Sequence, residues 1–359
     1  MAKPPAELLA MVSAALADEY EILRLEGPEL PIFLALACPL AEGVTGNRPR
    51  LPAGRGLTLN QALLAAGAEA LELRASLARN HAGTGYRKRK APAMAEAVDL
   101  LSGETVMRPA RRVYLDHPEA GGAGPPAGAD STGCAAGLDH AQACRSGLLE
   151  CIERDAVALW WHGALPRAAL PMAMIDPAAP RLGWWLDQRS RHTVLLDVTQ
   201  DSGVPAVVAY SCNRDGASIA VGSAAGFTAA EAALAAVTEM IQTEVSLELA
   251  ARSGDEEALR WLSVASVARM PQLEPDQAAP VQALDVPDSG GVLHRLARGG
   301  YRVSAVNLTL PGDPLISVRV SIDGYCALGG QIDAQRFRHI TGRAVDVSRL
   351  REGEFLEPY

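Results

Sequence analysis

The side chains best suited to chemistry in this chain are carboxylates and an amide that recur in pairs three residues apart. The pairs are Glu69 with Glu72, Glu150 with Glu153, and Glu239 with Gln242. At this spacing both members of a pair project from one face of an α-helix, about one turn apart. Carboxylate oxygens are the ligands of hard cations such as Mg²⁺, which commonly bridges one or two carboxylates to substrate phosphates. The pattern therefore indicates a metal and phosphate site.

Each pair follows the signature of a helix start. Thr58, Asp139 and Thr228 are N-cap residue types, and each stands eleven residues before the first member of its pair. Three positions after each cap comes a residue that completes a capping box, namely Gln61, Gln142 or Glu231. The sequence therefore predicts three helices that begin alike and present their polar pairs at the same height.

The surroundings of the first pair favour a buried site over a solvated face. No lysine or arginine occurs from Gln61 to Leu73, and most of these residues are apolar. A helix that is apolar nearly all round is typical of a protein interior, where an ionised carboxylate is costly unless it is paired or binds a metal. Glutamates on helices more commonly face water, and that remains the alternative. Neither a Walker loop nor a G-x-G-x-x-G sequence occurs, so a nucleotide would be bound without either motif.

Several segments together resemble the YcaO-domain family. The most specific is Ser131-Thr132-Gly133-Cys134, followed by Glu150-Cys151-Ile152-Glu153-Arg154-Asp155. Arg55 with the first glutamate pair, Glu239 with Gln242, and the runs from Val306 to Thr309 and from Val318 to Tyr325 are similar to further parts of that family. The resemblance covers residues 28–345, which we take as a YcaO-like catalytic domain between an N-terminal extension (1–27) and a C-terminal tail (346–359).

The resemblance implies an ATP- and Mg²⁺-dependent enzyme that activates a peptide backbone amide by phosphorylation. It implies a cyclodehydratase that forms azolines from Cys, Ser or Thr during biosynthesis of a ribosomally made peptide, such as a thiazole- or oxazole-containing bacteriocin. It assigns the metal to five glutamates and the nucleotide to four other residues. The metal ligands would be Glu69, Glu72, Glu150, Glu153 and Glu239, and the nucleotide contacts Arg55, Ser131, Arg154 and Gln242. For Arg154 the alternative is an ion pair with Glu150 within one helix.

Four positions differ from the family pattern: Ala65, Thr132, Ala235 and Glu244. Each replacement is expected to remove a polar contact of the nucleotide pocket. The last residues, Glu354 to Tyr359, also lack the Pro-x-Pro ending of many azoline-forming members. Three alternatives therefore stay open: thioamide formation with a sulfur-delivery partner, a non-catalytic subunit that binds nucleotide or peptide, and a purely structural protein with acidic helices.

Composition and the resemblance together predict the partners. The net charge of −9 argues against nucleic acid as a partner. The basic run from Arg87 to Lys90 is either a solvated loop or a landing place for phosphates or an acidic peptide. We expect a precursor peptide, a leader-peptide-binding partner protein because the chain begins with the catalytic domain, and as further candidates a dehydrogenase and a second copy in a homodimer. No apolar span or signal sequence is found, so no membrane contact and a cytoplasmic location are expected.

The six cysteines show neither C-x-x-C spacing nor paired histidines, so a zinc site is not indicated. Cys134 and Cys151 lie next to the predicted site, but their apolar surroundings favour a structural role. His140, directly after a helix cap, is expected to be exposed.

β-rich runs alternate with the helices and predict an α/β or α+β protein with mixed sheets covered by helices. The expected strands span residues 32–37, 194–198, 206–210, 218–223, 303–308 and 316–321, and a short amphipathic helix is expected over residues 5–17. The tandem tryptophans Trp160-Trp161 and Trp184-Trp185 are expected to anchor the core. The glycine- and proline-rich stretch of residues 117–128 is interpreted as a surface loop within one domain.

Overall fold

The computed structural model describes residues 5–25, 30–41, 51–78, 80–81, 94–117, 129–328 and 332–344. The chain divides into two units. Unit 1 contains residues 1–151 and 296–323, and unit 2 contains residues 152–295 and 324–359. Three sequence expectations fall outside the described residues: the basic run Arg87–Lys90, most of the loop over residues 117–128, and the C-terminal tail (346–359).

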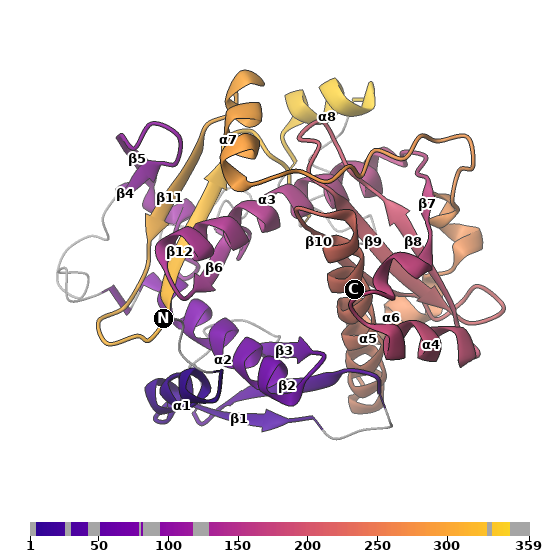
Figure 1. Cartoon of the computed structure of the whole chain (residues 1–359), viewed down its shortest axis with the longest axis horizontal. Coiled ribbons are helices and arrows are strands. Elements are labelled where there is room, and N and C mark those ends of the chain that lie inside the picture. The colour runs from indigo at the N-terminus through magenta and orange to yellow at the C-terminus, as the bar shows by residue number, and fades with distance from the viewer. Residues whose placement is uncertain are drawn as a thin grey trace. The chain divides into compact units, whose positions relative to one another are not determined.

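The first sheet of unit 1 is three-stranded, in the order β1-β2-β3 (Figure 1). Its strands are β1 (Tyr20–Arg24), β2 (Phe33–Pro39) and β3 (Ala53–Gly56), all paired antiparallel. Helix α2 (Leu59–Ser76) packs on β2 and β3, and α1 (Pro5–Leu16) packs on α2. The helix expected near the N-terminus is therefore present, and its buried side Leu8, Val12 and Leu16 joins the core of unit 1.

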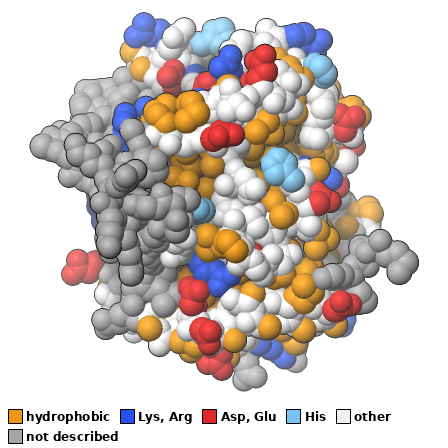
Figure 2. Space-filling view, turned by 90° about the vertical axis from the view of Figure 1, so that its left-hand side faces the viewer, with side chains coloured by type: hydrophobic (Ala, Val, Ile, Leu, Met, Phe, Trp, Pro, Cys, Tyr) orange, Lys and Arg blue, Asp and Glu red, His pale blue; other side chains and the backbone are white. Residues whose placement is uncertain are grey.

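The second sheet of unit 1 has the order β5-β4-β11-β12-β6, again with antiparallel pairs. Its strands are β4 (Met94–Asp99), β5 (Thr105–Pro109), β6 (Cys134–Gly137), β11 (Val303–Asn307) and β12 (Ile316–Ile322). The hairpin of β4 and β5 exposes Met94, Val98 and Met107. In the space-filling view, hydrophobic side chains lie interspersed with charged and polar ones (Figure 2).

Unit 2 is built on a four-stranded antiparallel sheet with the order β10-β9-β8-β7. Its strands are β7 (Ala169–Leu170), β8 (His192–Asp197), β9 (Ala206–Cys212) and β10 (Ala220–Ala225). Every residue of β9 is buried, and the long helix α5 (Ala229–Ser253) packs on β9 and β10. The shorter helices of this unit are α4 (Pro180–Gln188), α6 (Glu256–Val264) and α8 (Ala334–Thr341).

In two helices the chain passes from one unit to the other partway along the helix. Helix α3 (His140–Gly163) passes from unit 1 to unit 2 after Cys151, and α7 (Ser289–Arg298) passes back after Arg295. The chain enters unit 2 again after Asp323, in the turn that follows β12. Short 3₁₀ turns complete the described structure, at Ala110–Arg112, Met172–Ile175, Val267–Arg269 and Pro271–Leu273.

The two tandem tryptophan pairs differ in how deeply they are buried. Trp160 and Trp161 are buried, in edge-to-face contact at 5.4 Å between ring centroids, and Trp160 donates to the carbonyl of Gln272. The second pair does not anchor the core as expected, because Trp184 is 66% exposed. Helix α4 is amphipathic and buries Leu182, Gly183 and Leu186, which leaves Trp184 on its outer side.

The predicted fold class is confirmed: the chain combines several sheets with helices. The six expected strands are present, and their ends differ from the expected ones by at most two residues. Among the described helices, none combines the length and the apolar character that crossing a bilayer requires.

Candidate active site

Three strand–turn–helix segments position the acidic pairs, and each helix begins where the sequence indicates. In α2 and α5, the side chains of Thr58 and Thr228 accept from the backbone N–H three residues on, and Gln61 and Glu231 complete the capping boxes. In α3, Asp139 accepts from the N–H of Gln142 at 2.8 Å. The three predicted helix starts are therefore confirmed, and each pair stands about three turns into its helix.

The strand before each helix approaches the helix backbone closely, because small residues stand at fixed positions. Four and eight residues after the caps come Ala62 and Ala66 in α2, Ala143 and Gly147 in α3, and Ala232 and Ala236 in α5. These are buried, and strand glycines lie against most of them. A Cβ at Gly54 would meet the backbone of Ala62 and Ala66, one at Gly137 that of Ala143, and one at Gly222 that of Ala236 and Met240. Sequence reasoning missed this pattern, although the alanine spacing is readable.

In unit 1, the first pair is held by β3 and α2. The carboxylate of Glu69 accepts from the backbone N–H of Ala53 at 2.9 Å. Glu69 is exposed and Glu72 is half-buried, so the first helix is less enclosed than its composition indicates. Half of the buried residues of α2 are alanines.

Glu72 of α2 and Glu150 of α3 both lie near the Cys134 thiol of β6. Burial, the largest cause, acts together with the negative charges of Glu72 and Glu150 to raise the pKa of Cys134 to about 12, while Arg319 opposes them. Two carboxylates from different helices thus act on one buried atom. A concentration of negative charge of this kind, built from hard oxygen donors, fits a divalent cation.

The two cysteines next to the site are structural. Cys151 is buried, its Sγ lies 3.4 Å from the carbonyl oxygen of Val320, and burial raises the pKa of its thiol strongly. Since the thiolate is the nucleophilic form, neither Cys134 nor Cys151 is suited to attack a carbonyl near neutral pH. His140 is exposed, as expected, and lies 3.5 Å from the Sγ of Cys144.

The turn that carries Ser131 is fixed by an arginine that the sequence reading did not single out. Arg319 of β12 is buried and donates to the carbonyl of Asp130 at 2.6 Å. The carboxylate of Asp130 in turn accepts from the N–H of Thr132 at 2.9 Å. Gly133 has a φ of +79°, and a Cβ there would collide with the carbonyl of Val320. This glycine is therefore required by the backbone.

In unit 2, Glu153 is held against the sheet. Its carboxylate accepts from the hydroxyl of Ser223 in β10 at 2.7 Å, and only 12% of its side chain is exposed. Arg154 lies 3.9 Å from Glu153, too far for a hydrogen bond. Glu239 and Gln242 are half-buried on α5, where Gly222 of β10 packs against the helix. Within unit 2, β10 thus adjoins both helices that carry predicted site residues.

A buried ion pair lies directly after Glu153 and Arg154 in α3. Asp155 receives hydrogen bonds from Arg336 of α8 at 2.6 and 2.5 Å, and both side chains are 2% exposed. Asp155 also accepts from the N–H of Cys326 at 2.8 Å, and Arg336 continues to Asp201 at 2.9 Å. Sequence reasoning missed Arg336, since no local pattern marks a partner 181 residues away.

One of the four departures from the family pattern, Glu244, makes polar contacts of its own. Glu244 pairs with Arg189 at 2.9 Å and with Arg191 at 3.2 Å, and it accepts from the Ser211 hydroxyl. Glu244 therefore belongs to an ion-pair network in which two arginines of unit 2 provide the positive charge. At Ala65 and Ala235 the small side chains are half-buried on their helices.

The predicted metal and nucleotide ligands are divided between the two units. Unit 1 carries Arg55, Glu69, Glu72, Ser131 and Glu150, and unit 2 carries Glu153, Arg154, Glu239 and Gln242. Among the described residues, no group of three or more His, Cys, Asp or Glu side chains is spaced to hold a metal ion. The five-glutamate site therefore stays a prediction, supported by donor chemistry and by the shared neighbourhood of Glu72 and Glu150.

Comparison with solved structures reveals the same fold in several proteins. A heterocyclase in complex with substrate and cofactor superposes with a TM-score of 0.77 at 21% identity, over 99% of this chain and 56% of that chain. YcaO from Methanopyrus kandleri, bound with AMPPCP and Mg²⁺, gives 0.67 at 24% identity, over 90% and 91%. The Escherichia coli microcin synthetase McbBCD complex with pro-MccB17 gives 0.66 at 13% identity, over 92% and 95%. At these identities the likeness establishes the fold.

The chain spans little more than half the length of the heterocyclase chain. No curated protein matches its sequence significantly. The family model described as YcaO cyclodehydratase, ATP- and Mg²⁺-binding, matches residues 78–326. This match covers more than half of the chain, and it includes the Ser131 turn, the acidic segment of α3 and the predicted site of α5. The chain therefore belongs to the YcaO cyclodehydratase family, whose cofactors are ATP and Mg²⁺.

Proposed function

We propose that this protein is an ATP- and Mg²⁺-dependent cyclodehydratase that forms azolines from Cys, Ser or Thr of a ribosomally made peptide. The observation that carries the proposal is the family match across the acidic segment of α3. An amide oxygen is a poor leaving group. Transfer of the γ-phosphoryl group of ATP to that oxygen, after the Cys, Ser or Thr side chain has added to the amide carbon, lets the oxygen depart as phosphate.

The glutamates would hold Mg²⁺, which neutralises charge on the phosphates. Their assignment is supported by the caps and close strand contacts that fix each pair at the same height of its helix. Arg55 and Arg154 are suited to phosphate oxygens because a guanidinium presents several donors in a fixed fork. Ser131 and Gln242 would supply neutral hydrogen bonds to the nucleotide. Cys134 and Cys151 have no chemical step, since burial keeps both thiols protonated.

The proposed substrate is a precursor peptide, captured with the help of a leader-peptide-binding partner protein. The solved McbBCD complex contains pro-MccB17, and the heterocyclase structure contains substrate, so both neighbours support this assignment. A dehydrogenase that oxidises the azoline and a homodimer of this chain are further proposals of the same kind.

Calorimetry of the full chain with ATP and Mg²⁺ tests the nucleotide site. We expect the double variant E150Q/E153Q to bind at least about tenfold more weakly, because a charge-assisted contact contributes about 1.5–3 kcal/mol. E248Q is the matched control, since Glu248 lies on α5 in an exposed pair with Arg252. Equal affinity of both variants for MgATP would show that the carboxylates of α3 do not hold the metal.

The product distinguishes the proposed reaction from its alternatives. In the presence of peptide and partner, mass spectrometry should detect the loss of one water for each ring formed. Exchange of oxygen for sulfur, seen only with a sulfur-delivery partner, would instead assign thioamide formation. ATP binding without any change of the peptide, under conditions in which the partner itself is competent, would favour a binding subunit.

A further inference from the structure

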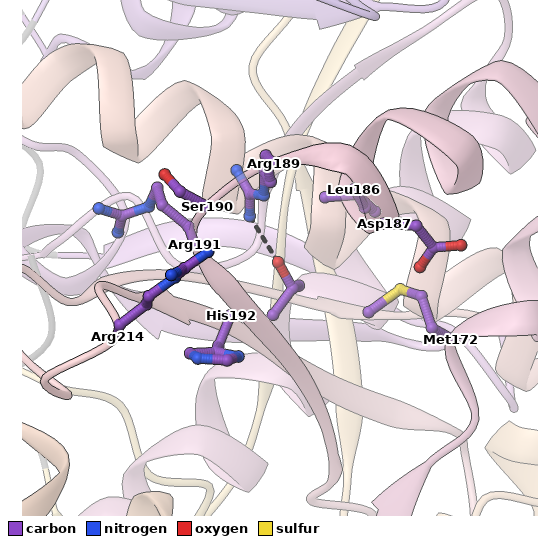
Figure 3. A pocket seen from close by; sticks show the side chains of 9 residues that line it. Met172, Leu186, Asp187, Arg189, Ser190, Arg191, His192 and Arg214 are labelled. Atoms are coloured by element: carbon purple, nitrogen blue, oxygen red, sulfur yellow. Dashed lines mark hydrogen bonds between the residues drawn. The ribbon is translucent and has the colours of Figure 1, made fainter.

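A cavity of about 320 Å³ in unit 2 concentrates basic side chains (Figure 3). It is lined by Arg189, Arg191 and His192, from the junction of α4 and β8, and by Arg214, which follows β9. None of these residues belongs to the metal or nucleotide site proposed above. In Figure 3 the basic side chains gather on one side of the cavity, and Leu186, Asp187 and Met172 lie on the other.

Two of the arginines share a single carboxylate. Arg189 donates to both oxygens of Glu244 at 2.9 and 3.0 Å, and Arg191 donates to one of them at 3.2 Å. Two guanidinium charges therefore face one carboxylate charge. Burial lowers the pKa of Arg189, Arg191 adds to this effect, and Glu244 opposes it. A second anion in the cavity would restore the balance of charge.

The arginines are held in place before any ligand arrives. Arg189 is 9% exposed, stacks over Trp185 at 4.8 Å and donates to the hydroxyl of Thr193 at 2.5 Å. Arg191 donates to Ser211 at 2.9 Å and to the carbonyl of Ser218 at 2.6 Å. Rigid groups lose little conformational entropy when a ligand binds, which favours affinity.

Some donors at this cavity have no partner among the described residues. The Nε of Arg189 is buried without a hydrogen bond. Arg214 and His192 are exposed, and neither side chain makes an ion pair or hydrogen bond with the part of the chain that the structure describes. Arg214 and His192 line the cavity, so their side chains can donate to the oxygens of an anion bound there.

The opposite side of the cavity limits what else the ligand can contain. Leu186 and Met172 offer apolar surface, and Asp187 is a negative charge that repels a second anionic group. The volume is at the lower end of the range for small-molecule sites, which is roughly 300–1,000 Å³. An occupant with one anionic head and a short apolar body fits both sides.

We propose that this cavity binds a small oxyanion of the carboxylate or phosphate class, with the anionic group on the arginine side and an apolar body against Leu186 and Met172. Guanidinium groups match the oxygens of both classes, so the chemistry is shared. No residue that lines the cavity is among the predicted metal or nucleotide ligands, and the proposal does not rest on the proposed function.

Titration of the full chain with hexanoate and with inorganic phosphate, followed by NMR or calorimetry, tests this assignment. R214Q is expected to weaken binding at least about fivefold, since charged hydrogen bonds are among the stronger ones. H192Q tests the second unpartnered group. D187N should preserve or strengthen binding because it removes a repelling charge. The matched control is R181Q, an exposed arginine of the same helix α4 that does not line the cavity.

Preference for hexanoate would identify the carboxylate class, and preference for phosphate would identify the phosphate class. Binding must persist in E150Q/E153Q, because those residues belong to the nucleotide site. Loss of phosphate binding in that double variant would place the anion at the nucleotide site and overturn the proposal. The absence of millimolar binding of either probe, or equal weakening by R214Q and R181Q, would also overturn it.

Discussion

The buried pair of Asp155 and Arg336 is the contact of unit 2 whose loss should cost most. Replacing Arg336 by Met keeps the apolar part of the side chain but removes the guanidinium. Among the described residues, Asp155 would then keep only the hydrogen bond from the N–H of Cys326, and its side chain is 2% exposed. Removing one partner of a buried ion pair typically costs about 3–5 kcal/mol, because an uncompensated charge stays in a poorly solvated place. We expect R336M to lose that much stability.

Urea denaturation followed by circular dichroism measures this cost. R252M is the control, because Arg252 and Glu248 form an ion pair at 2.5 Å with side chains 71% and 57% exposed. Both variants replace an arginine by methionine, but the pair that R252M breaks is exposed. Exposed ion pairs typically contribute about 0–1 kcal/mol, so R252M should cost much less stability than R336M. The double variant D155L/R336M should be more stable than R336M alone, since it removes the stranded charge.

Equal destabilisation by R336M and R252M would refute the reasoning, as would a double variant whose loss equals the sum of the single losses. The first result would mean that burial does not set the cost of the stranded carboxylate. The second would mean that the two side chains do not act as a unit.

Three further predictions follow from the same contacts. Ellman's reagent at pH 8 should label half-buried Cys38 before Cys134, and all cysteines should react alike in urea. Burial raises the pKa of Cys134 from 9.0 to about 12, so as the pH rises the thiol loses its proton in the unfolded chain before it does in the folded one. The free energy of unfolding should therefore fall between pH 9 and 12, and it should fall less in C134A than in the wild type. G222A should cost about 1–3 kcal/mol in urea denaturation by forcing β10 away from α5, whereas T228A, which removes the helix cap, should cost about 1 kcal/mol.

Local signals explain why the helices could be predicted from the sequence. The caps at Thr58, Asp139 and Thr228 act within one turn, so four consecutive residues contain the necessary information. The expected strands were long apolar runs, of which β9 is the clearest. Strands β3 and β6 were not predicted because each has only four residues, rich in glycine and alanine, and neither residue has a preference for strands.

The division into two units could not be found in the sequence because it does not fall in a linker. Two of its three crossings fall inside α3 after Cys151 and inside α7 after Arg295, where the helical pattern continues without interruption, and the third falls in the short turn after β12. Contacts between segments that are distant in the chain could not be predicted from the sequence either. Arg319 and Arg336 fix the Ser131 turn and α3, but their partners lie far away in the chain, and an arginine in a strand or short helix ordinarily indicates a solvated side chain.

The spacing of the acidic pairs acquires its meaning from the helix contacts. An α-helix turns by about 100° per residue, so positions 4, 8, 11 and 14 after a cap fall within about 120° of one another. In α2 and α5 the first two positions are the alanines on which β3 and β10 pack, and the last two are the polar pairs. The strand and the carboxylates therefore use the same side of the helix, and the polar pair emerges where the strand contact ends. A bulky residue at Ala62 or Ala236 would displace the strand and, with it, the partners that hold the acidic pairs, Ala53 for Glu69 and Ser223 for Glu153. Small residues at these positions are thus as necessary to the proposed site as the glutamates themselves.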